Sequence, residues 1–415
     1  MKKLLVTAMC LLLLAGCGRN QPEPTETVTV PTTAATVPSV DYIFPEEAPT
    51  DPLPEEIESP VPQMPQPVQP EPWQTVPVPT YPQIPEFTNL EEFRAYLYHQ
   101  VDAGNLNMTI RYTGFPSDLA PQTIARIGNL LYVQCLPQGD LYEITLWEYP
   151  GQRMVRAYRT GDRSGLREGE ALALDTAIVM VDQARTDAVT PLELELRLFD
   201  MLRETVRYNE GTTEIMDPEA PPRYLTALGA LLDGNANCQG YTDAMYVLLS
   251  VAGFENSKMH VDIPTGGHVV NTVCVGGNWY VLDATFSDYD DPTGIQISYR
   301  LFNAGVDKCT EYSWEPVMER YFLSRQTDSN YYYYSNLGGD NKVYGDLDSM
   351  AEGILNGWQQ QGKTEHYVML TDANVGWAEL GDALNRAANL RGLYISYDIW
   401  VENNRRDTFF FVRLS

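Results

Sequence analysis

The chain has 415 residues, 56 of them Asp or Glu and 28 Lys or Arg, which gives a formal net charge of −28 at pH 7. A protein this acidic repels nucleic acids and other polyanions, so we exclude them as partners, and it tolerates a substrate that carries amines. The length is enough for several compact units, each with its own core.

The N-terminus has the pattern of an export signal. Two lysines, Lys2 and Lys3, precede an apolar stretch from Leu4 to Leu14 that is too short to cross a bilayer. The following segment, Leu14-Ala15-Gly16-Cys17, resembles the lipobox of bacterial lipoproteins. The resemblance implies a signal peptide over residues 1–16 and a lipid on Cys17, which would anchor the protein at the outer face of the bacterial cell membrane. The alternative is an ordinary cleaved signal in which Cys17 is incidental.

Residues 17–86 cannot form a core. Eighteen of the 29 prolines fall between Pro22 and Pro85, and no Lys or Arg occurs between Asn20 and Arg94. Such a composition predicts a disordered, self-repelling and partly polyproline II linker. At about 3.1 Å per residue it could reach roughly 200 Å, far enough to hold a domain away from the membrane.

A first small α/β module is predicted over residues 87–164. Its expected elements are a helix capped by Thr88 and running through Val101, a strand over Met108–Tyr112, a short helix after Pro121, and a hairpin of Leu141–Tyr149 with Met154–Tyr158.

The central domain is predicted over residues 165–305. It begins with three helices, over Glu168–Arg185, from Pro191 (capped by Thr190) to Tyr208, and over Arg223–Leu232. A fourth helix starts at Cys238 and stops before Gly253, and two strands follow, divided by a hairpin turn at Gly276-Gly277.

A second α/β module, over residues 306–415, repeats the element order of the first. The expected elements are a helix over Leu347–Gln361, a strand over His366–Thr371, a helix over Val375–Ala388, and two strands over Leu393–Val401 and Thr408–Leu414. The shared order suggests that the two flanking modules are related.

Three residues of the central domain have the roles that thiol-based acyl transfer needs. Cys238 is at a helix start, where unpaired backbone N–H groups favour a thiolate. His268 opens the first hairpin strand and Asp283 ends the second. If Val275 pairs with Asn278, the register places Asp283 on the same face as His268, where a carboxylate can fix the imidazole tautomer. The candidate triad is therefore nucleophile, base and orienting acid.

The segments that carry these residues are Asn237-Cys238-Gln239-Gly240-Tyr241, His268-Val269-Val270-Asn271 and Trp279-Tyr280-Val281-Leu282-Asp283-Ala284-Thr285. Together they resemble the bacterial transglutaminase-like superfamily. The resemblance implies an α+β fold: a papain-like transglutaminase core, with a helix bundle packed on an antiparallel sheet, flanked here by the two α/β modules. It also implies Cys238 as nucleophile, His268 as base and acid, and Asp283 as orienter, with no cofactor and no metal. Val270 and Gln239 depart from the usual pattern, which puts the shape of the pocket in doubt, and a second oxyanion donor is not assigned.

The remaining cysteines do not suggest another site. Cys10 leaves with the signal, and Cys135, Cys274 and Cys309 are odd in number and have no metal-ligand spacing. We therefore expect neither a disulfide framework nor zinc.

Two other candidate sites in the sequence are less favoured. His260 is a competing base, but it lacks the hairpin context of His268. Asp288, Asp290 and Asp291 fail the spacing of a calcium-binding loop, so a solvated acidic loop is favoured there.

Two functions remain open at this point. The first is a membrane-tethered cysteine peptidase, amidase or crosslinking acyltransferase that acts on a protein or peptide, cell-wall peptide being one candidate substrate. The second is a catalytically silent surface protein that uses the fold as a scaffold for binding. The sequence decides neither the substrate nor the oligomeric state.

Overall fold

The structure of the chain is a computed structural model that describes residues 83–212, 214–287, 298–314, 318, 333, 342–404 and 407–415. The predicted signal peptide, nearly all of the proline-rich linker and the acidic loop at 288–291 lie outside these ranges. Within them, no helix has both the length and the apolar character that crossing a bilayer requires.

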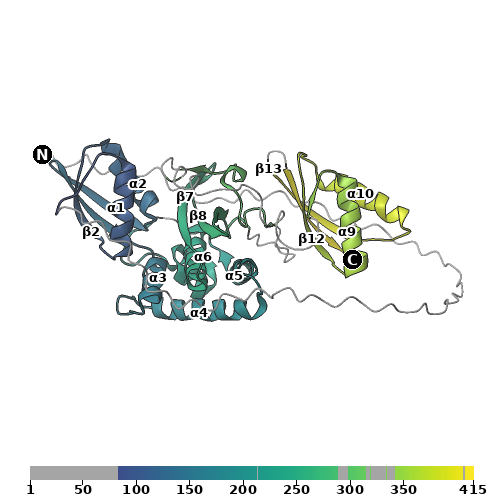
Figure 1. Cartoon of the computed structure of the whole chain (residues 1–415), viewed down its shortest axis with the longest axis horizontal. Coiled ribbons are helices and arrows are strands. Elements are labelled where there is room, and N and C mark those ends of the chain that lie inside the picture. The colour runs from purple at the N-terminus through teal and green to yellow at the C-terminus, as the bar shows by residue number, and fades with distance from the viewer. Residues whose placement is uncertain are drawn as a thin grey trace, which may run out of the picture.

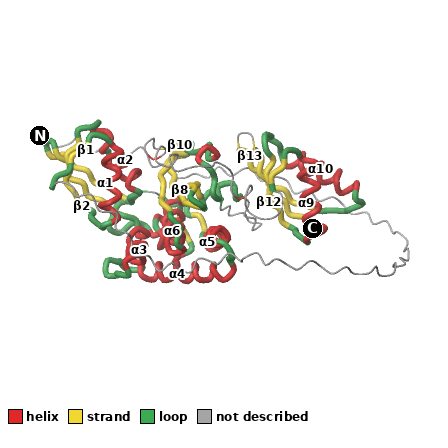
Figure 2. Tube along the Cα trace, viewed as in Figure 1, coloured by secondary structure: helices red, strands yellow, loops and turns green. Residues whose placement is uncertain are grey.

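Three four-stranded sheets with attached helices make up the fold (Figures 1 and 2). The module with α1 and α2 and the module with α9 and α10 lie at opposite ends, and the helices α3 to α6 lie together below β7 and β8 of the central sheet in this view. The α+β class predicted from the sequence is confirmed. The domain boundaries given above remain predictions.

The first module consists of β1 (Glu86–Phe87), α1 (Leu90–Asp102), β2 (Asn107–Tyr112), the 3-10 turn η1 (Pro116–Leu119), α2 (Pro121–Gly128), β3 (Tyr132–Gln138) and β4 (Leu141–Trp147). Its sheet has the order β1-β2-β4-β3, with β1 parallel to β2. The cap of α1 is Asn89 and not Thr88, because the Asn89 side chain accepts from the backbone N–H of Glu92 at 3.0 Å.

The predicted hairpin of Leu141–Tyr149 with Met154–Tyr158 is wrong. β4 pairs with β3, and the second predicted strand belongs to helix α3 (Pro150–Thr160). Pro150 is at the first helical position, which favours a helix start, and the alternation in this short segment fits either period. The helix is fixed by two arginines that reach buried carboxylates, Arg153 to Glu170 and Arg156 to Glu148.

The central domain contains α4 (Glu170–Asp187), α5 (Pro191–Thr205) and α6 (Cys238–Ala252), together with the two-residue strands β5 (Arg207–Tyr208) and β6 (Asn235–Ala236). The predicted helix over Arg223–Leu232 is replaced by a 3-10 turn, η2 (Arg223–Leu225), and a π-helical turn, η3 (Gly229–Asp233). The break falls at Thr226, whose backbone is extended, and the next N–H, that of Ala227, bonds to a carboxylate of α6 at 3.0 Å.

The central sheet has the order β10-β7-β8-β9. Its strands are β7 (Asn256–Ile263), β8 (Gly266–Val275), β9 (Asn278–Leu282) and β10 (Ser313–Trp314). The 3-10 turn η4 (Val306–Lys308) lies between β9 and β10 in the chain. Strand β7 was not predicted. Its sequence is mostly polar, and Lys258 stands at a fully buried position.

The last module consists of β11 (Val343–Tyr344), α9 (Leu347–Gln361), β12 (Glu365–Leu370), α10 (Trp377–Leu390), β13 (Tyr397–Asn404) and β14 (Asp407–Leu414). Its sheet order, β11-β12-β14-β13, and its single parallel pair repeat those of the first module. The two flanking modules therefore share one topology.

Ion pairs join each module to the central sheet. Arg126 of α2 binds Asp262 of β7 through two bonds of 2.7 and 2.5 Å. On the other side, Arg300 donates to Glu402 of β13 at 2.6 Å. Ion pairs thus link the central domain, which includes α6, to both flanking modules.

Inside this unit, a buried carboxylate holds α6. Asp243 Oδ1 accepts from Lys258 Nζ at 2.9 Å, and Asp243 Oδ2 accepts from the backbone N–H groups of Gly151 and Ala227, both at 3.0 Å. Neither Asp243 nor Lys258 is exposed beyond 2%. The ammonium also lies 3.7 Å from the ring centroid of Tyr149.

We expect Lys258→Ala to lower the free energy of unfolding by roughly 3–5 kcal/mol, because it leaves a charged carboxylate buried without its partner. Urea denaturation followed by tryptophan fluorescence measures this. Lys308→Ala, at a partly exposed lysine, is the control and should change the stability by less than about 1 kcal/mol. Equal effects of the two substitutions would contradict the role given to the Lys258–Asp243 pair.

Candidate active site

Cys238 is the first residue of α6. The preceding residue, Asn237, caps the helix: its Oδ1 accepts from the N–H groups of Gln239 at 3.0 Å and Gly240 at 3.3 Å. A Cβ on Gly240 would lie 2.5 Å from the carbonyl oxygen of Tyr224. Only glycine allows this close approach, so packing fixes the turn that presents the cysteine.

Two hydrogen bonds tie α6 to β8 next to His268. Thr242 Oγ1 donates to the carbonyl of Val269 at 2.8 Å, and Asn271 Nδ2 donates to the carbonyl of Thr242 at 3.0 Å. Thr242 is one helical turn after Cys238 on the same face, and Val269 follows His268 directly. The start of α6 therefore packs against the segment of β8 that carries His268. Both Cys238 and His268 are buried.

His268 and Asp283 are brought together. His268 Nε2 lies 2.7 Å from Asp283 Oδ2. The predicted pairing of Val275 with Asn278 is confirmed. The hairpin pairing ends at Asn271 and Leu282, before it reaches His268. Asp283 still reaches the imidazole from the first position after the strand.

The carboxylate of Asp283 is fully engaged. Tyr312 donates its hydroxyl to Oδ2, and the backbone N–H groups of Thr285 and Phe286 donate to Oδ1 at 2.9 and 3.0 Å. Burial alone would raise the pKa of Asp283, but the charge and hydrogen bond of His268, together with the other donors, lower it below its ordinary value. A carboxylate only accepts, so His268 Nε2 carries the proton, and Nδ1 is the basic nitrogen.

Aromatic rings fix the orientation of the imidazole. Phe286 stacks on His268 with ring centroids 4.4 Å apart, and the ring of Tyr312 is 5.9 Å away. Neither residue was predicted for the site. Phe286 follows Asp283 by three positions and could have been suspected, whereas Tyr312 is 29 residues further on and no local pattern indicates it.

Cys238, His268 and Asp283 lie in the part of the chain that a family model matches. Residues 180–284 match the family described as the Transglutaminase-like superfamily. The chain carries a transglutaminase-like domain. The match begins within α4 and ends one residue after Asp283, so the transglutaminase-like domain includes all three predicted triad residues.

Solved structures resemble the chain only distantly. One is described as the crystal structure of a TGase, with 12% identity, 45% of this chain and 52% of the other covered, and a TM-score of 0.25. Another is the periplasmic domain of TgpA from Pseudomonas aeruginosa bound to ethylmercury, with 12% identity, 35% and 55% covered, and a TM-score of 0.23. The chain thus spans about half the length of each, and these scores are too low to support an argument. No curated protein matches the chain.

Tyr149, which precedes α3, also belongs to the surroundings of the transglutaminase-like site. Its pKa is well above the ordinary value, first because the ring is buried and then because of the negative charges of Asp243 and Cys238. The phenol of Tyr149 therefore stays protonated. It comes from outside the family match, so no motif indicated it.

The rival base and the other cysteines are not part of this arrangement. His260 pairs with Val269 on the adjacent strand, which places it on the opposite face of the sheet from His268. Burial, followed by the charge of Arg126, lowers the pKa of His260 to about 3, so it stays neutral. Burial raises the pKa of both Cys135 and Cys309 above the ordinary value. In the described part of the chain, no cluster of ligating side chains could hold a metal ion.

Glu195 is a buried acid that contacts the segment of Leu301 and Asn303, and this segment positions Asp283. Asn303 Nδ2 donates to Glu195 Oε2 at 2.9 Å, while Glu195 Oε1 and Asn303 Oδ1 are both buried and have no partner. A proton on Glu195 Oε1 would donate to Asn303 Oδ1 and satisfy both atoms. Burial raises the pKa of Glu195 to about 8. In the same segment as Asn303, the carbonyl of Leu301 accepts a hydrogen bond from the backbone N–H of Asp283 at 3.0 Å.

We expect the contribution of Glu195 to the free energy of unfolding to fall as the pH rises from about 4.5 to about 8, whereas the lowered pKa of His260 contributes in the opposite direction up to about 6.5. The folded-state pKa of Glu195 is raised, so the folded protein binds more protons than the unfolded chain within this window. The loss should total roughly 3–5 kcal/mol, and Glu195→Gln should remove it, because the amide can donate to Asn303 without ionising. Urea denaturation of both proteins at several pH values tests this. A wild-type profile that matches that of the variant would contradict a neutral Glu195.

Proposed function

We propose that the transglutaminase-like domain is a cysteine-dependent enzyme that acts on amide bonds of a protein or peptide through a thioester on Cys238. The observation that carries the proposal is the buried His268 Nε2–Asp283 Oδ2 contact of 2.7 Å on a strand to which α6 is bonded at Thr242. This contact leaves Nδ1, the other imidazole nitrogen, as the base.

In the first half of the reaction, Nδ1 of His268 takes the proton of the Cys238 thiol. The sulfur attacks the amide carbonyl, so a C–S bond forms and the carbonyl π electrons move onto oxygen. The positive end of the α6 dipole stabilises the developing negative charge, whereas the N–H groups of Gln239 and Gly240 donate to the cap residue Asn237. His268 then protonates the nitrogen, the C–N bond breaks and an amine departs, leaving a thioester.

In the second half, water or an amine attacks the thioester, and His268 removes a proton from the attacking group. The sulfur leaves and recovers its proton from His268. Water gives a carboxylic acid, which makes the protein a peptidase or amidase. An amine gives a new amide, which makes it a crosslinking acyltransferase.

We further propose that this chemistry takes place outside the cytoplasm, at the outer face of the bacterial cell membrane. The support is the lipobox-like segment ending at Cys17 and the long acidic, proline-rich segment that follows it. A protein or cell-wall peptide within reach of the tether is the substrate that this placement favours.

Mild treatment with iodoacetamide at neutral pH tests the thiol. Cys238 should be modified before Cys135 and Cys309, because burial raises the pKa of these two thiols. Asp283→Asn should slow the modification of Cys238 at least tenfold, because the imidazole loses its carboxylate partner. Intact-mass measurement followed by peptide mapping gives the site.

Cys238→Ala tests the catalytic function, and Cys309→Ala, at another buried cysteine, is its control. Cys238→Ala should abolish the turnover of amide substrates with little change in melting temperature, whereas Cys309→Ala should retain it. Wild-type protein incubated with a peptide library should gain an acyl mass that hydroxylamine removes. Unchanged biological function in the Cys238→Ala protein would instead support a silent binding role.

A further inference from the structure

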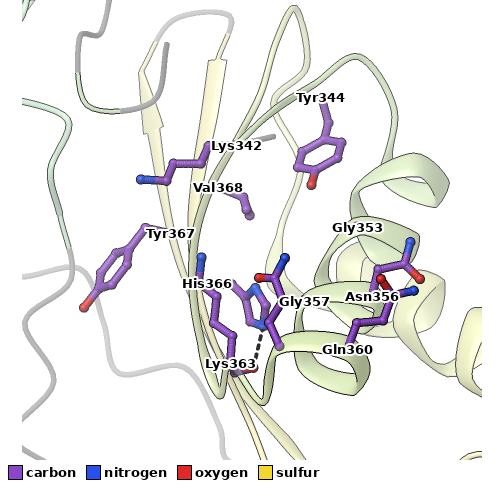
Figure 3. A pocket seen from close by; sticks show the side chains of 11 residues that line it. Lys342, Tyr344, Gly353, Asn356, Gly357, Gln360, Lys363, His366, Tyr367 and Val368 are labelled. Carbon is purple, nitrogen blue, oxygen red and sulfur yellow. Dashed lines mark hydrogen bonds between the residues drawn. The ribbon is translucent and has the colours of Figure 1, made fainter. Parts of the chain in front are cut away.

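The last module contains a cavity of about 190 Å³ between helix α9 and strand β12. Figure 3 shows the ring of His366 between the strand and the helix, with the side chain of Lys363 alongside. An engineered cavity of about 150 Å³ in another protein holds one benzene molecule. The cavity therefore has room for a molecule of amino-acid size.

The first module, which has the same topology, shows how this cavity arises. Aligning the two helix caps, Asn89 and Asp346, superposes buried residues of α1 on buried residues of α9: Phe93 on Met350 and Leu97 on Ile354. In this alignment two residues of α1, Tyr96 and Gln100, correspond to Gly353 and Gly357 of α9. The cavity lies where α9 lacks the side chains that α1 carries.

At both glycines, the space that a side chain would need is taken by a neighbouring residue that lines the cavity. A Cβ on Gly353 would lie 2.1 Å from the hydroxyl of Tyr344, and a Cβ on Gly357 would lie 2.8 Å from Cε1 of His366. Glycine inside a helix is unfavourable relative to other residues. The topology does not require this, because α1 has the same place in its module without glycine there. The glycines therefore make room for Tyr344, for His366 and for the cavity between them.

The lining is basic and rich in amides, although the chain as a whole is strongly acidic. Lys342 and Lys363 are among the lining residues, together with His366 and three primary amides, and no Asp or Glu is among them. Lys342 lies over the ring of Tyr333, 4.1 Å from its centroid, and Lys363 lies beside His366.

Two carboxylates that adjoin lining residues in the sequence are paired with arginines. Glu352 of α9 binds Arg391, and Glu365 of β12 binds Arg413 at 2.8 Å. The polar groups thus suit a ligand with one negative charge and neighbouring hydrogen-bonding groups. A doubly charged anion is less favoured, because the cavity lies along the C-terminal half of α9, where the helix dipole is negative.

We propose that this cavity binds a small carboxylate of amino-acid size, either a free amino acid or the C-terminal residue of a peptide. Lys363 contacts the carboxylate, and the amides of Asn356, Gln360 and Gln361 bind the adjoining polar groups. The site is separate from Cys238 and does not depend on its chemistry.

The chain has only four histidines, so the full-length protein labelled at histidine Cε1 gives a simple NMR spectrum in which one signal reports on this cavity. N-acetyl-L-alanine should shift the His366 signal in a saturable way and leave those of His99 and His260 in place. N-acetyl-L-alaninamide, which lacks the charge, should not. Comparison with free L-alanine assigns the source: tighter binding of the acetylated compound identifies a peptide terminus, and tighter binding of alanine identifies a free amino acid.

Two variants and a control complete the test. Lys363→Gln should weaken binding by roughly tenfold or more, because a charge-assisted bond is lost, whereas Lys308→Gln should leave it unchanged. Gly357→Ala should weaken binding, because the new Cβ would lie 2.8 Å from Cε1 of His366 and displace the ring that lines the cavity, with circular dichroism as the check on folding. A His366 signal that does not respond to millimolar ligand would overturn the proposal. Equal affinity for the amide, or for the Lys363→Gln protein, would do the same. A shift confined to His268 would place the ligand at the Cys238 site instead.

Discussion

The placement of Cys238 depends on the buried carboxylate of Asp243, five residues further along α6. This side chain binds an ammonium on β7 and backbone N–H groups from α3 and from the turn after η2. An unpaired charge in such a position is very costly, so the three partners and the helix are constrained to fold together. The same carboxylate explains two departures from local sequence preference: the interrupted helix at Thr226, and the lysine at a buried strand position. A strong long-range requirement has overridden weak local ones.

Asp283 is held in a comparable way by segments that are distant in sequence. Its oxygens receive donors from β8, from the turn that follows β9 and from Tyr312, and its own N–H is accepted by Leu301. The segment that includes Leu301 is in turn fixed by the Glu195–Asn303 pair. The orienting acid is therefore set by packing outside the hairpin, which explains why it reaches His268 although β9 ends one residue earlier.

The local features of the site were predictable and its long-range surroundings were not. The helix start at Cys238 followed from a polar turn before an apolar stripe, and the two glycines at 276 and 277 fixed the hairpin register correctly. The errors occurred where a short segment fits two periods, as at Met154–Tyr158, or where burial of a charge contradicts composition, as in β7. Tyr149 and Tyr312 approach the site from segments outside the family match, and nothing in their local sequence indicates a partner. Their roles depend on tertiary packing alone.

The flanking modules separate what a topology requires from what a particular chain adds to it. Both have one parallel and two antiparallel strand pairs and two helices, and the buried positions of α1 and α9 correspond. One copy fills the space between helix and sheet with Tyr96, whose ring lies 5.1 Å from that of Phe87. The other gives up helix-favouring residues at two positions and leaves a basic, amide-lined hollow. The filled copy shows that the fold is complete without the hollow, so the two glycines follow from the choice of Tyr344 and His366, which pack against α9 at these positions and line the hollow.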